Sequence, residues 1–433
     1  MEQNEKKRED RAVLVGVVYG GEMQESVERG LCELEGLLDT AGGVTVAKMM
    51  QNKGSPDPRT MIGSGKAAEL SVLCEANDVT LVVFDCELSP SQIRNLEDIL
   101  GNEIRVIDRS MLILDIFALH AVTGEGKLQV ELAQLKYTAP RLSGHGAEMS
   151  RLGGGIGTRG PGESKLETDK RHMMRRVQAL ERQIAEMDKN RKTMRAARDR
   201  SGIPEVAIVG YTNAGKSTLL NRLTDAGILA EDKLFATLDP TTRKFILPSG
   251  EPILLTDTVG FINKLPHHLI RAFRSTLEEA CQADVLLVLT DASDESFREQ
   301  LRVTESLLSE LGAADKPTLY VFNKCDRGMA EIARVGREAP DDRMVFISAK
   351  TGQGVDRMIE KLTEIVSEGK RRVTYRIPNA EGGALNTLYR YATVESVEYG
   401  DEAMTVIALA DSQARGMLRR FAVDDPEPRE DWE

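Results

Sequence analysis

The sequence predicts an α/β protein of several domains, and three observations carry this prediction. Strand-like and helix-like segments alternate over residues 11–122 and again over residues 203–370, a pattern typical of parallel sheets covered by helices. Between these regions, apolar residues recur at heptad spacing, which predicts long paired helices. A glycine-rich motif stands between a strand and a helix at residues 210–217, where such folds bind phosphate.

Length and composition narrow the class of protein. The chain has 433 residues, of which 41 % are hydrophobic and 29 % are charged, so we expect several domains with cores of their own. No run of about 18 apolar residues occurs, and the charged first residues are not typical of a secretory signal. The five cysteines form no C-x-x-C pair. We therefore expect a cytoplasmic protein with reduced thiols.

The first domain is predicted over residues 1–126. Short β-branched runs alternate there with amphipathic segments, which predicts a small parallel sheet covered on both faces. The expected strands span 12–18, 44–50, 80–84 and 104–107, and the expected helices span 25–38, 67–76 and 89–100.

An antiparallel helical hairpin is predicted over residues 127–202. Leu128, Leu132 and Leu135 begin one heptad series, and a second series runs from Leu166 to Met194. The second helix, over about 163–200, would be roughly 55 Å long. At residues 371–433 the pattern predicts a small α+β module with an acidic tail.

The connection between the two predicted helices, residues 143–162, contains eight glycines in 20 residues, together with Arg151 and Arg159. Successive glycine N–H groups can form anion-binding concavities, and arginine binds phosphate with two parallel hydrogen bonds. We therefore expect this tip to contact RNA through Arg151 and Arg159. A flexible linker is the alternative interpretation.

The charge distribution points the same way. The whole chain has a net charge of −12, which is not typical of a general nucleic-acid-binding protein. Residues 141–200 contain 15 Lys and Arg against 8 Asp and Glu, a net charge of +7, which leaves −19 for the other 373 residues. A basic segment within an acidic protein favours contact with an RNA backbone, and an ordinary solvated helix face is the alternative.

The motif at residues 210–217, G-Y-T-N-A-G-K-S, matches the phosphate-binding loop (P-loop) G-x-x-x-x-G-K-[ST] and follows a strand expected at 206–209. Its backbone N–H groups are expected to hold the α- and β-phosphates, Lys216 to reach the β- and γ-oxygens, and Ser217 to bind Mg²⁺. The predicted contacts are Gly210, Tyr211, Thr212, Asn213, Ala214, Gly215, Lys216 and Ser217.

Three further motifs follow at strand ends, in the order that a GTPase requires. D-T-V-G places Asp257 to hold Mg²⁺ through water and the Gly260 N–H toward the γ-phosphate. N-K-C-D places the Asp326 carboxylate to accept hydrogen bonds from the guanine N1–H and 2-amino group, a donor pair that adenine lacks. S-A-K places the Ala349 N–H near the guanine O6. The predicted contacts are Asp257, Thr258, Val259, Gly260, Asn323, Lys324, Cys325, Asp326, Ser348, Ala349 and Lys350.

A threonine between the first two motifs should complete the Mg²⁺ shell when GTP is bound. Thr237, Thr241 and Thr242 all lie in the segment between these motifs, and their spacing does not distinguish among them.

Taken together, G-Y-T-N-A-G-K-S, F-A-T-L-D-P, D-T-V-G-F, N-K-C-D and the tip G-G-G-I-G-T-R-G-P-G-E resemble the motifs of the HflX family of translation-factor-related GTPases. The resemblance covers nearly the whole chain. The motifs themselves predict a P-loop GTPase domain (G domain) over 203–370, beside the N-terminal α/β domain, the helical hairpin and the C-terminal module. The resemblance to the HflX family implies that Thr237 is the Mg²⁺ ligand. The γ-phosphate switch then includes Phe235, Ala236, Thr237, Leu238 and Asp239.

The same resemblance implies a function. It predicts a GTPase with GTP, GDP and Mg²⁺ as ligands that binds the large ribosomal subunit near the peptidyl-transferase centre. The associated role is splitting, rescue or recycling of stalled ribosomes, often under stress. We expect a monomer. The alternative is a GTP-dependent regulator that acts through the hairpin on a protein or on a complex peripherally associated with a membrane.

Phe261 follows D-T-V-G where signalling GTPases carry the glutamine that orients the attacking water. A phenyl ring has no group for this task, so we expect slow intrinsic hydrolysis. The predicted catalytic residues are Lys216, Thr237 and Gly260, which stabilise charge on the phosphates, and no general base can be named.

Overall fold

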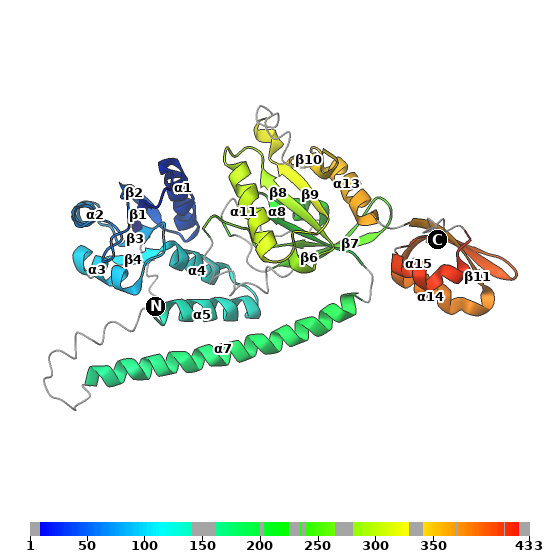
Figure 1. Cartoon of the computed structure of the whole chain (residues 1–433), viewed down its shortest axis with the longest axis horizontal. Coiled ribbons are helices and arrows are strands. Elements are labelled where there is room, and N and C mark those ends of the chain that lie inside the picture. Colours follow the sequence, from blue (N-terminus) through cyan, green and yellow to red (C-terminus); the bar gives the residue numbers. More distant parts are fainter. Residues whose placement is uncertain are drawn as a thin grey trace, which may run out of the picture.

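The computed structural model describes residues 9–101, 103–140, 161–199, 203–224, 234–235, 240–264, 280–328, 341–368, 371–410 and 412–423. Within these ranges the strands form three separate sheets of four, six and three strands (Figure 1). No helix in the described part of the chain has the length and apolar character needed to cross a membrane.

The N-terminal domain is built on a parallel sheet with the strand order β2-β1-β3-β4. Its strands are β1 (Arg11–Val18), β2 (Val44–Asn52), β3 (Leu81–Phe84) and β4 (Arg105–Asp108), and its helices are α1 (Gln24–Thr40), α2 (Ser64–Ala76), α3 (Pro90–Leu100) and α4 (Arg109–His120). Helix α4 was not predicted from the sequence. All the strands and helices that were predicted in this region are present, with ends that differ by a few residues.

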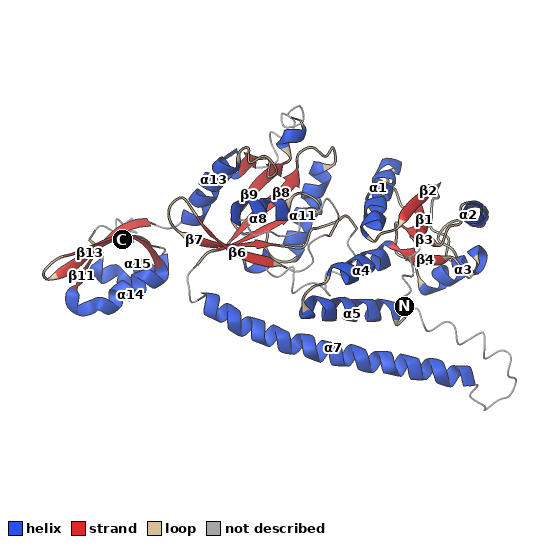
Figure 2. Cartoon of the chain, turned by 180° about the vertical axis from the view of Figure 1, so that it is seen from behind, coloured by secondary structure: helices blue, strands red, loops and turns tan. Residues whose placement is uncertain are grey.

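Both faces of this sheet are buried, which explains why β1 is apolar almost throughout. Ala12 and Leu14 belong to one apolar cluster, with residues of α1 and α4. Val13 and Val15 belong to another, with residues of α2 and α3. Because successive side chains of a strand point to opposite faces, α1 and α4 cover one face of the sheet, and α2 and α3 cover the other (Figure 2).

The G domain contains the six-stranded sheet, with the strand order β10-β9-β8-β5-β7-β6. All neighbouring strands are parallel except β6 and β7. The strands are β5 (Glu205–Gly210), β6 (Thr241–Ile246), β7 (Pro252–Asp257), β8 (Val285–Asp291), β9 (Thr318–Asn323) and β10 (Met344–Phe346), and the helices are α8 (Lys216–Thr224), α11 (Phe297–Glu310) and α13 (Val355–Ser367). Short 3-10 turns η3 (Cys325–Arg327) and η4 (Asp341–Arg343) flank β9 and β10.

The apolar core is continuous between the N-terminal domain and the G domain. One buried cluster includes Leu34 of α1, Phe117 of α4, Val209 of β5 and Phe261. The rings of Phe117 and Phe235 meet edge to face, with centroids 4.8 Å apart. The two domains are therefore packed against each other through apolar side chains as well as polar ones.

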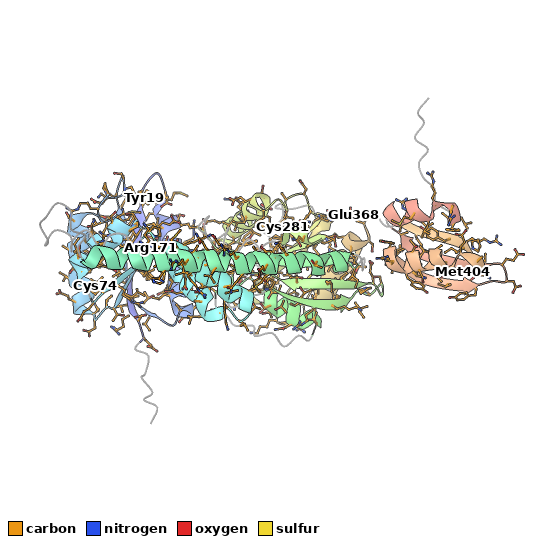
Figure 3. All side chains as sticks on the ribbon, turned by 90° about the horizontal axis from the view of Figure 1, so that it is seen from below. Tyr19, Cys74, Arg171, Cys281, Glu368 and Met404 are labelled. Carbon is orange, nitrogen blue, oxygen red and sulfur yellow. The ribbon has the colours of Figure 1, made fainter. Side chains whose placement is uncertain are left out.

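Helices α5 (Gly124–Thr138) and α7 (Pro161–Asp199) occupy the region where the hairpin was predicted. They lie side by side (Figures 1 and 2), with Lys136 bound to Glu181 at 2.7 Å and Arg176 Nε bound to Glu131 at 2.7 Å. Figure 3 shows α7 passing beneath both the N-terminal domain and the G domain. The predicted RNA-contacting residues Arg151 and Arg159 lie outside the described residues.

A three-stranded antiparallel sheet with the strand order β11-β13-β12 forms the C-terminal module. Its elements are β11 (Arg371–Pro378), η5 (Asn379–Glu381), α14 (Gly382–Tyr391), β12 (Ala392–Tyr399), β13 (Ala403–Ala410), α15 (Ser412–Leu418) and η6 (Arg419–Phe421). Tyr375 is fully buried in its core. Strand β12 was not predicted.

Candidate nucleotide-binding site

The predicted P-loop connects β5 to α8, and its glycines are required by local geometry. Gly210 has a φ angle of 149°, and a Cβ atom there would lie 2.1 Å from the Leu289 carbonyl oxygen. Gly215 has a φ angle of 97°, and its Cβ would lie 2.3 Å from Asn323 Nδ2. Positive φ and close backbone approach both exclude side chains here. The loop is thus held open to a ligand that approaches its backbone.

Lys216 begins α8 and is buried. Its ammonium group donates hydrogen bonds to the carbonyl oxygens of Gly210, at 3.2 Å, and Tyr211, at 2.9 Å. Burial lowers the pKa of Lys216 to about 8, although the Asp257 carboxylate opposes this shift. The ammonium charge of Lys216 therefore lies inside the loop. To bind phosphate oxygens, the ammonium has to give up only its hydrogen bonds to two neutral carbonyl groups.

Ser217 and Asp257 come together from α8 and β7. The Ser217 hydroxyl donates to Asp257 Oδ2 at 2.6 Å, and Asp257 is fully buried. Hard oxygen donors of this kind fit Mg²⁺, which is usually bound by one or two protein groups together with phosphates and water. Among the residues that the structure describes, no group of three or more His, Cys, Asp or Glu side chains is placed to hold a metal without such help.

The D-T-V-G segment lies directly against the P-loop. The Phe261 N–H donates to the Gly210 carbonyl at 3.0 Å, and the Thr212 N–H donates to the Phe261 carbonyl at 2.7 Å. A Cβ on Gly260 would lie 2.8 Å from Thr212 Cα and 2.9 Å from Lys216 Nζ. Gly260 can therefore be only glycine, and its backbone stands beside the Lys216 ammonium.

Asn323, at the end of β9, joins the two ends of the candidate site. Its Nδ2 donates to the Ala214 carbonyl at 2.8 Å, and its Oδ1 accepts from the Ala349 N–H at 2.9 Å. Because Asn323 is buried, both bonds are shielded from water. Asn323, which was predicted as a nucleotide contact, thus connects the P-loop to the S-A-K loop.

The remaining residues of the N-K-C-D motif are oriented by local contacts. Lys324 adopts a left-handed backbone conformation, with φ at 65°, and its ammonium lies 2.8 Å from Asp291 Oδ2. A hydrogen bond from Ser348 holds the pKa of the Asp326 carboxyl below its usual value, so this group is an acceptor at neutral pH. Burial raises the pKa of the Cys325 thiol, which leaves Cys325 as a packing residue.

Arg222 and Asp291 were not identified from the sequence. Arg222 of α8 donates from Nε to the Ala349 carbonyl at 2.8 Å and from Nη2 to the Lys350 carbonyl at 2.9 Å. Arg222 belongs to none of the four motifs, and only its tertiary contacts with the S-A-K loop reveal its role.

A polar network joins the candidate site to the N-terminal domain, and the sequence showed no sign of it. The Tyr211 hydroxyl donates to the Glu33 carboxylate and accepts from the Asn263 N–H at 2.6 Å. Arg109 binds Glu33, donates to the Asn263 carbonyl at 3.0 Å and donates to Asp85 Oδ1 at 2.7 Å. The segment that follows D-T-V-G is therefore held at Asn263 by both domains.

The same network explains the charge state of Arg109. Burial alone would lower its pKa, but the carboxylates of Glu33 and Asp85 outweigh burial, so the pKa of Arg109 is raised. Lys264 Nζ adds a second cation, 3.1 Å from Asp85 Oδ2.

Phe235 was predicted as a nucleotide contact, but its described position is different. It has a φ angle of 57°, is buried, and packs against Phe117 of α4. Its ring thus contributes to the core between the domains. The neighbouring predicted residues Ala236, Thr237, Leu238 and Asp239 lie outside the described residues.

The four motifs converge on one edge of the six-stranded sheet, where P-loop, D-x-x-G, N-K-x-D and S-A-K residues contact one another. This convergence defines the chain as a P-loop GTPase. Family models match three consecutive regions: "GTP-binding GTPase N-terminal" at residues 28–118, "GTP-binding GTPase Middle Region" at 120–198 and "50S ribosome-binding GTPase" at 205–324.

Curated relatives cover nearly all of the chain. "GTPase HflX" of Lacrimispora saccharolytica is 49% identical over 408 residues, which are 94% of this chain and 95% of the relative. "GTPase HflX" of Escherichia coli is 41% identical over 387 residues, which are 89% and 90% of the two chains. The chain belongs to the HflX family of GTPases, as the motifs had indicated. A solved GTP-binding protein from Sulfolobus solfataricus, in complex with GDP, is 24% identical with a TM-score of 0.43 over 83% of this chain and 99% of its own.

Proposed function

We propose that this GTPase binds GTP and Mg²⁺ at the convergent edge of the G-domain sheet. The observation that carries this proposal is a frame in which the P-loop backbone joins the hydrogen bond of Ser217 with Asp257 to those of Asn323 with Ala214 and Ala349. Ser217 would bind Mg²⁺ directly, together with Thr237, and Asp257 would bind it through water. The ion, when bound, neutralises charge on the β- and γ-phosphates.

In this proposal each end of the frame recognises one end of GTP. The P-loop N–H groups and Lys216 bind the phosphates, and the Gly260 N–H binds the γ-phosphate. Asp326 recognises the guanine, while Asn323 and the Ala349 N–H, which are hydrogen-bonded to each other, hold the S-A-K loop beside it. Phe261 is 1 % exposed, so its ring takes no part in orienting water, and the intrinsic rate of hydrolysis is slow.

We further propose that the GTPase binds the large ribosomal subunit and couples GTP binding and hydrolysis to the splitting, rescue or recycling of stalled ribosomes. Two observations support this. The G domain matches a family described as "50S ribosome-binding GTPase", and residues 141–200 carry a net charge of +7 in an acidic chain. In this proposal residues 127–202 act as an arm whose tip, with Arg151 and Arg159, contacts ribosomal RNA.

The test is steady-state GTP hydrolysis with and without purified large ribosomal subunits, at two salt concentrations. The expected result is a rate increase of about ten-fold or more, equivalent to about 1.4 kcal/mol of activation free energy. The increase should fall at high salt, because phosphate contacts release counterions. Replacement of both Arg151 and Arg159 by Ala should abolish it, whereas Arg59→Ala combined with Arg376→Ala, two exposed positions outside the arm, should not.

The alternative function, regulation of a protein or membrane-associated complex through the hairpin, makes the opposite prediction. Large subunits would then leave the hydrolysis rate unchanged while GTP binding stays intact. Retained stimulation in the Arg151→Ala, Arg159→Ala variant would show that the subunit is contacted elsewhere.

A further inference from the structure

The side chain of Thr212, in the middle of the P-loop, has a polar group without an assigned role. Thr212 is 6 % exposed, and its hydroxyl oxygen has no hydrogen-bond partner among the described residues. Buried hydroxyl groups are nearly always hydrogen-bonded in folded proteins. An exception in a ligand-binding loop indicates that the partner arrives with the ligand.

The other hydroxyl groups of this loop and of D-T-V-G are already engaged. Ser217 donates to Asp257, Thr258 donates to the Ile208 carbonyl at 2.8 Å, and Tyr211 donates to Glu33. Among the described hydroxyls of the two motifs, Thr212 alone is available to a bound nucleotide or to water.

Thr212 also lies near Gly260, one of the residues that are expected to bind the γ-phosphate. Its N–H is bound to the Phe261 carbonyl at 2.7 Å. A Cβ built on Gly260 would lie 2.8 Å from both Cα and Cγ2 of Thr212, and 2.9 Å from Lys216 Nζ. Lys216 and the Gly260 N–H are the expected γ-phosphate ligands of a P-loop GTPase. The Cγ2 methyl group of Thr212 is thus beside Gly260, and Thr212 also lines a cavity of about 560 Å³ between the domains, whose lining includes neither Gly260 nor Lys216.

Phe261, which stands where signalling GTPases carry the water-orienting glutamine, cannot orient the attacking water. Phe261 is buried in the apolar core and bound through its backbone to the P-loop. A polar group that orients the water would therefore come from elsewhere, and among the described hydroxyls of the two motifs that of Thr212 has no partner.

We propose that Thr212 is a catalytic residue of GTP hydrolysis, with its hydroxyl bound to the attacking water; this inference rests on the proposed nucleotide site. The water oxygen forms a bond to the γ-phosphorus, and the bond from this phosphorus to the β–γ bridging oxygen breaks, so that GDP leaves. The protons of the water pass to the released phosphate and to solvent. Thr212 accepts a hydrogen bond from the water and donates one to a γ-phosphate oxygen, so it gains and loses no proton.

The test compares Thr212→Val, which keeps the shape and removes the hydroxyl, with Thr212→Ser, which keeps the hydroxyl and removes the methyl group. Three quantities are measured: kcat at saturating GTP, the Kd for GDP, and the Kd for GDP with aluminium fluoride, a mimic of the transferring phosphoryl group. Thr212→Val should lower kcat about ten-fold and weaken the aluminium fluoride complex by a similar factor, with the Kd for GDP changed less than two-fold. Thr212→Ser should recover most of the lost rate.

Several outcomes would overturn the inference. These are an unchanged kcat in Thr212→Val, equal losses of kcat in the Val and Ser variants, or a loss of GDP affinity as large as the loss of kcat. Lys216→Ala separates this result from the proposed site. If that variant loses GTP binding while Thr212→Val is silent, the nucleotide site stands and only the role of Thr212 fails. If Lys216→Ala binds GTP normally, both fail.

Discussion

Tyr211 of the P-loop donates a hydrogen bond to Glu33 of α1, a residue 178 positions earlier in the chain. The same hydroxyl accepts a hydrogen bond from the backbone of Asn263, which follows the D-T-V-G motif. Burial raises the pKa of the Tyr211 phenol, and the charge of Glu33 raises it further. The phenol therefore keeps its proton and remains a donor, and it joins the P-loop, the segment after D-T-V-G and the N-terminal domain.

Arg109 should stabilise this interface far more than the exposed ion pair beside it. Arg109→Met leaves the buried carboxylate of Asp85 and the partly buried carboxylate of Glu33 without their guanidinium partner, and should lower the free energy of unfolding by about 3–5 kcal/mol. Arg29 binds Glu299 across the same interface at 3.0 Å but is half exposed. Arg29→Met should therefore cost at most about 1 kcal/mol. Thermal unfolding measures both, and equal effects would contradict this account.

Nucleotide binding should take up a proton at alkaline pH. The pKa of Lys216 is about 8 in the nucleotide-free protein because the ammonium is buried, and bound phosphates should raise it. Above pH 8 the free protein binds fewer protons at this site than the complex, so GTP affinity should fall as pH rises, by up to about ten-fold per pH unit. Calorimetry at pH 8.5 in buffers of different ionisation enthalpy measures the uptake. A binding enthalpy that does not depend on the buffer would refute it.

The same lysine has the opposite effect on the stability of the nucleotide-free fold. Its folded-state pKa lies below its ordinary value of 10.5, so the unfolded chain binds the proton more tightly. The resulting penalty is fully present below pH 8 and is relieved as pH rises between the two values. Opposite slopes of affinity and stability over this window would distinguish Lys216 from a general effect of pH.

Asp326 should set the base specificity. Asp326→Asn replaces one acceptor oxygen by an amino donor, which can pair with the 2-oxo group of xanthine but not with the 2-amino group of guanine. We expect GTP affinity to fall at least about 100-fold, while the affinity for xanthosine triphosphate rises above that for GTP. Competition against a fluorescent GDP analogue measures both, and a variant that still prefers GTP would remove Asp326 from the recognition site.

Gly210 should tolerate no side chain, whereas Gly250, which also has a positive φ angle, should tolerate alanine. Gly250 has a φ angle of 84° in the turn between β6 and β7, and a Cβ there would meet nothing within 4 Å. Gly250→Ala should therefore cost only about 1–2 kcal/mol of backbone strain. Gly210→Ala adds the 2.1 Å clash with Leu289 and should abolish nucleotide binding or folding. GDP affinity and thermal unfolding of the two variants provide the comparison.

The motifs of the site could be predicted because each lies in one short stretch of sequence beside a strand. The contacts between motifs could not. Asn323 was expected to contact the nucleotide, but its bonds to Ala214 and Ala349 reach residues 109 and 26 positions away, and no spacing rule reveals them. The same reason hid Arg109 and Glu33, which reach the site only through tertiary packing.

Two elements, helix α4 and strand β12, were not predicted from the sequence, and each has a local physical reason. Helix α4 has the sequence RSMLILDIFALH and is buried on most sides, so it lacks the polar face that makes a helix recognisable. Strand β12, ATVESVEY, lies at the edge of its sheet and is largely exposed, so its apolar alternation is weak. Phe235 followed from its motif as a nucleotide contact, yet its ring packs on Phe117 of the unpredicted α4.

Helix α7 has 39 residues, which at 1.5 Å per residue give a rod of about 58 Å. One end leads into β5 and the P-loop, and the other leads back to the glycine-rich tip. Packed against α5 through the ion pairs of Glu181 with Lys136 and of Arg176 with Glu131, such a rod acts as a lever, and each degree of tilt at one end displaces the other by about 1 Å. A rotation of the G domain by a few degrees would thereby displace the far end of α7 by several ångströms.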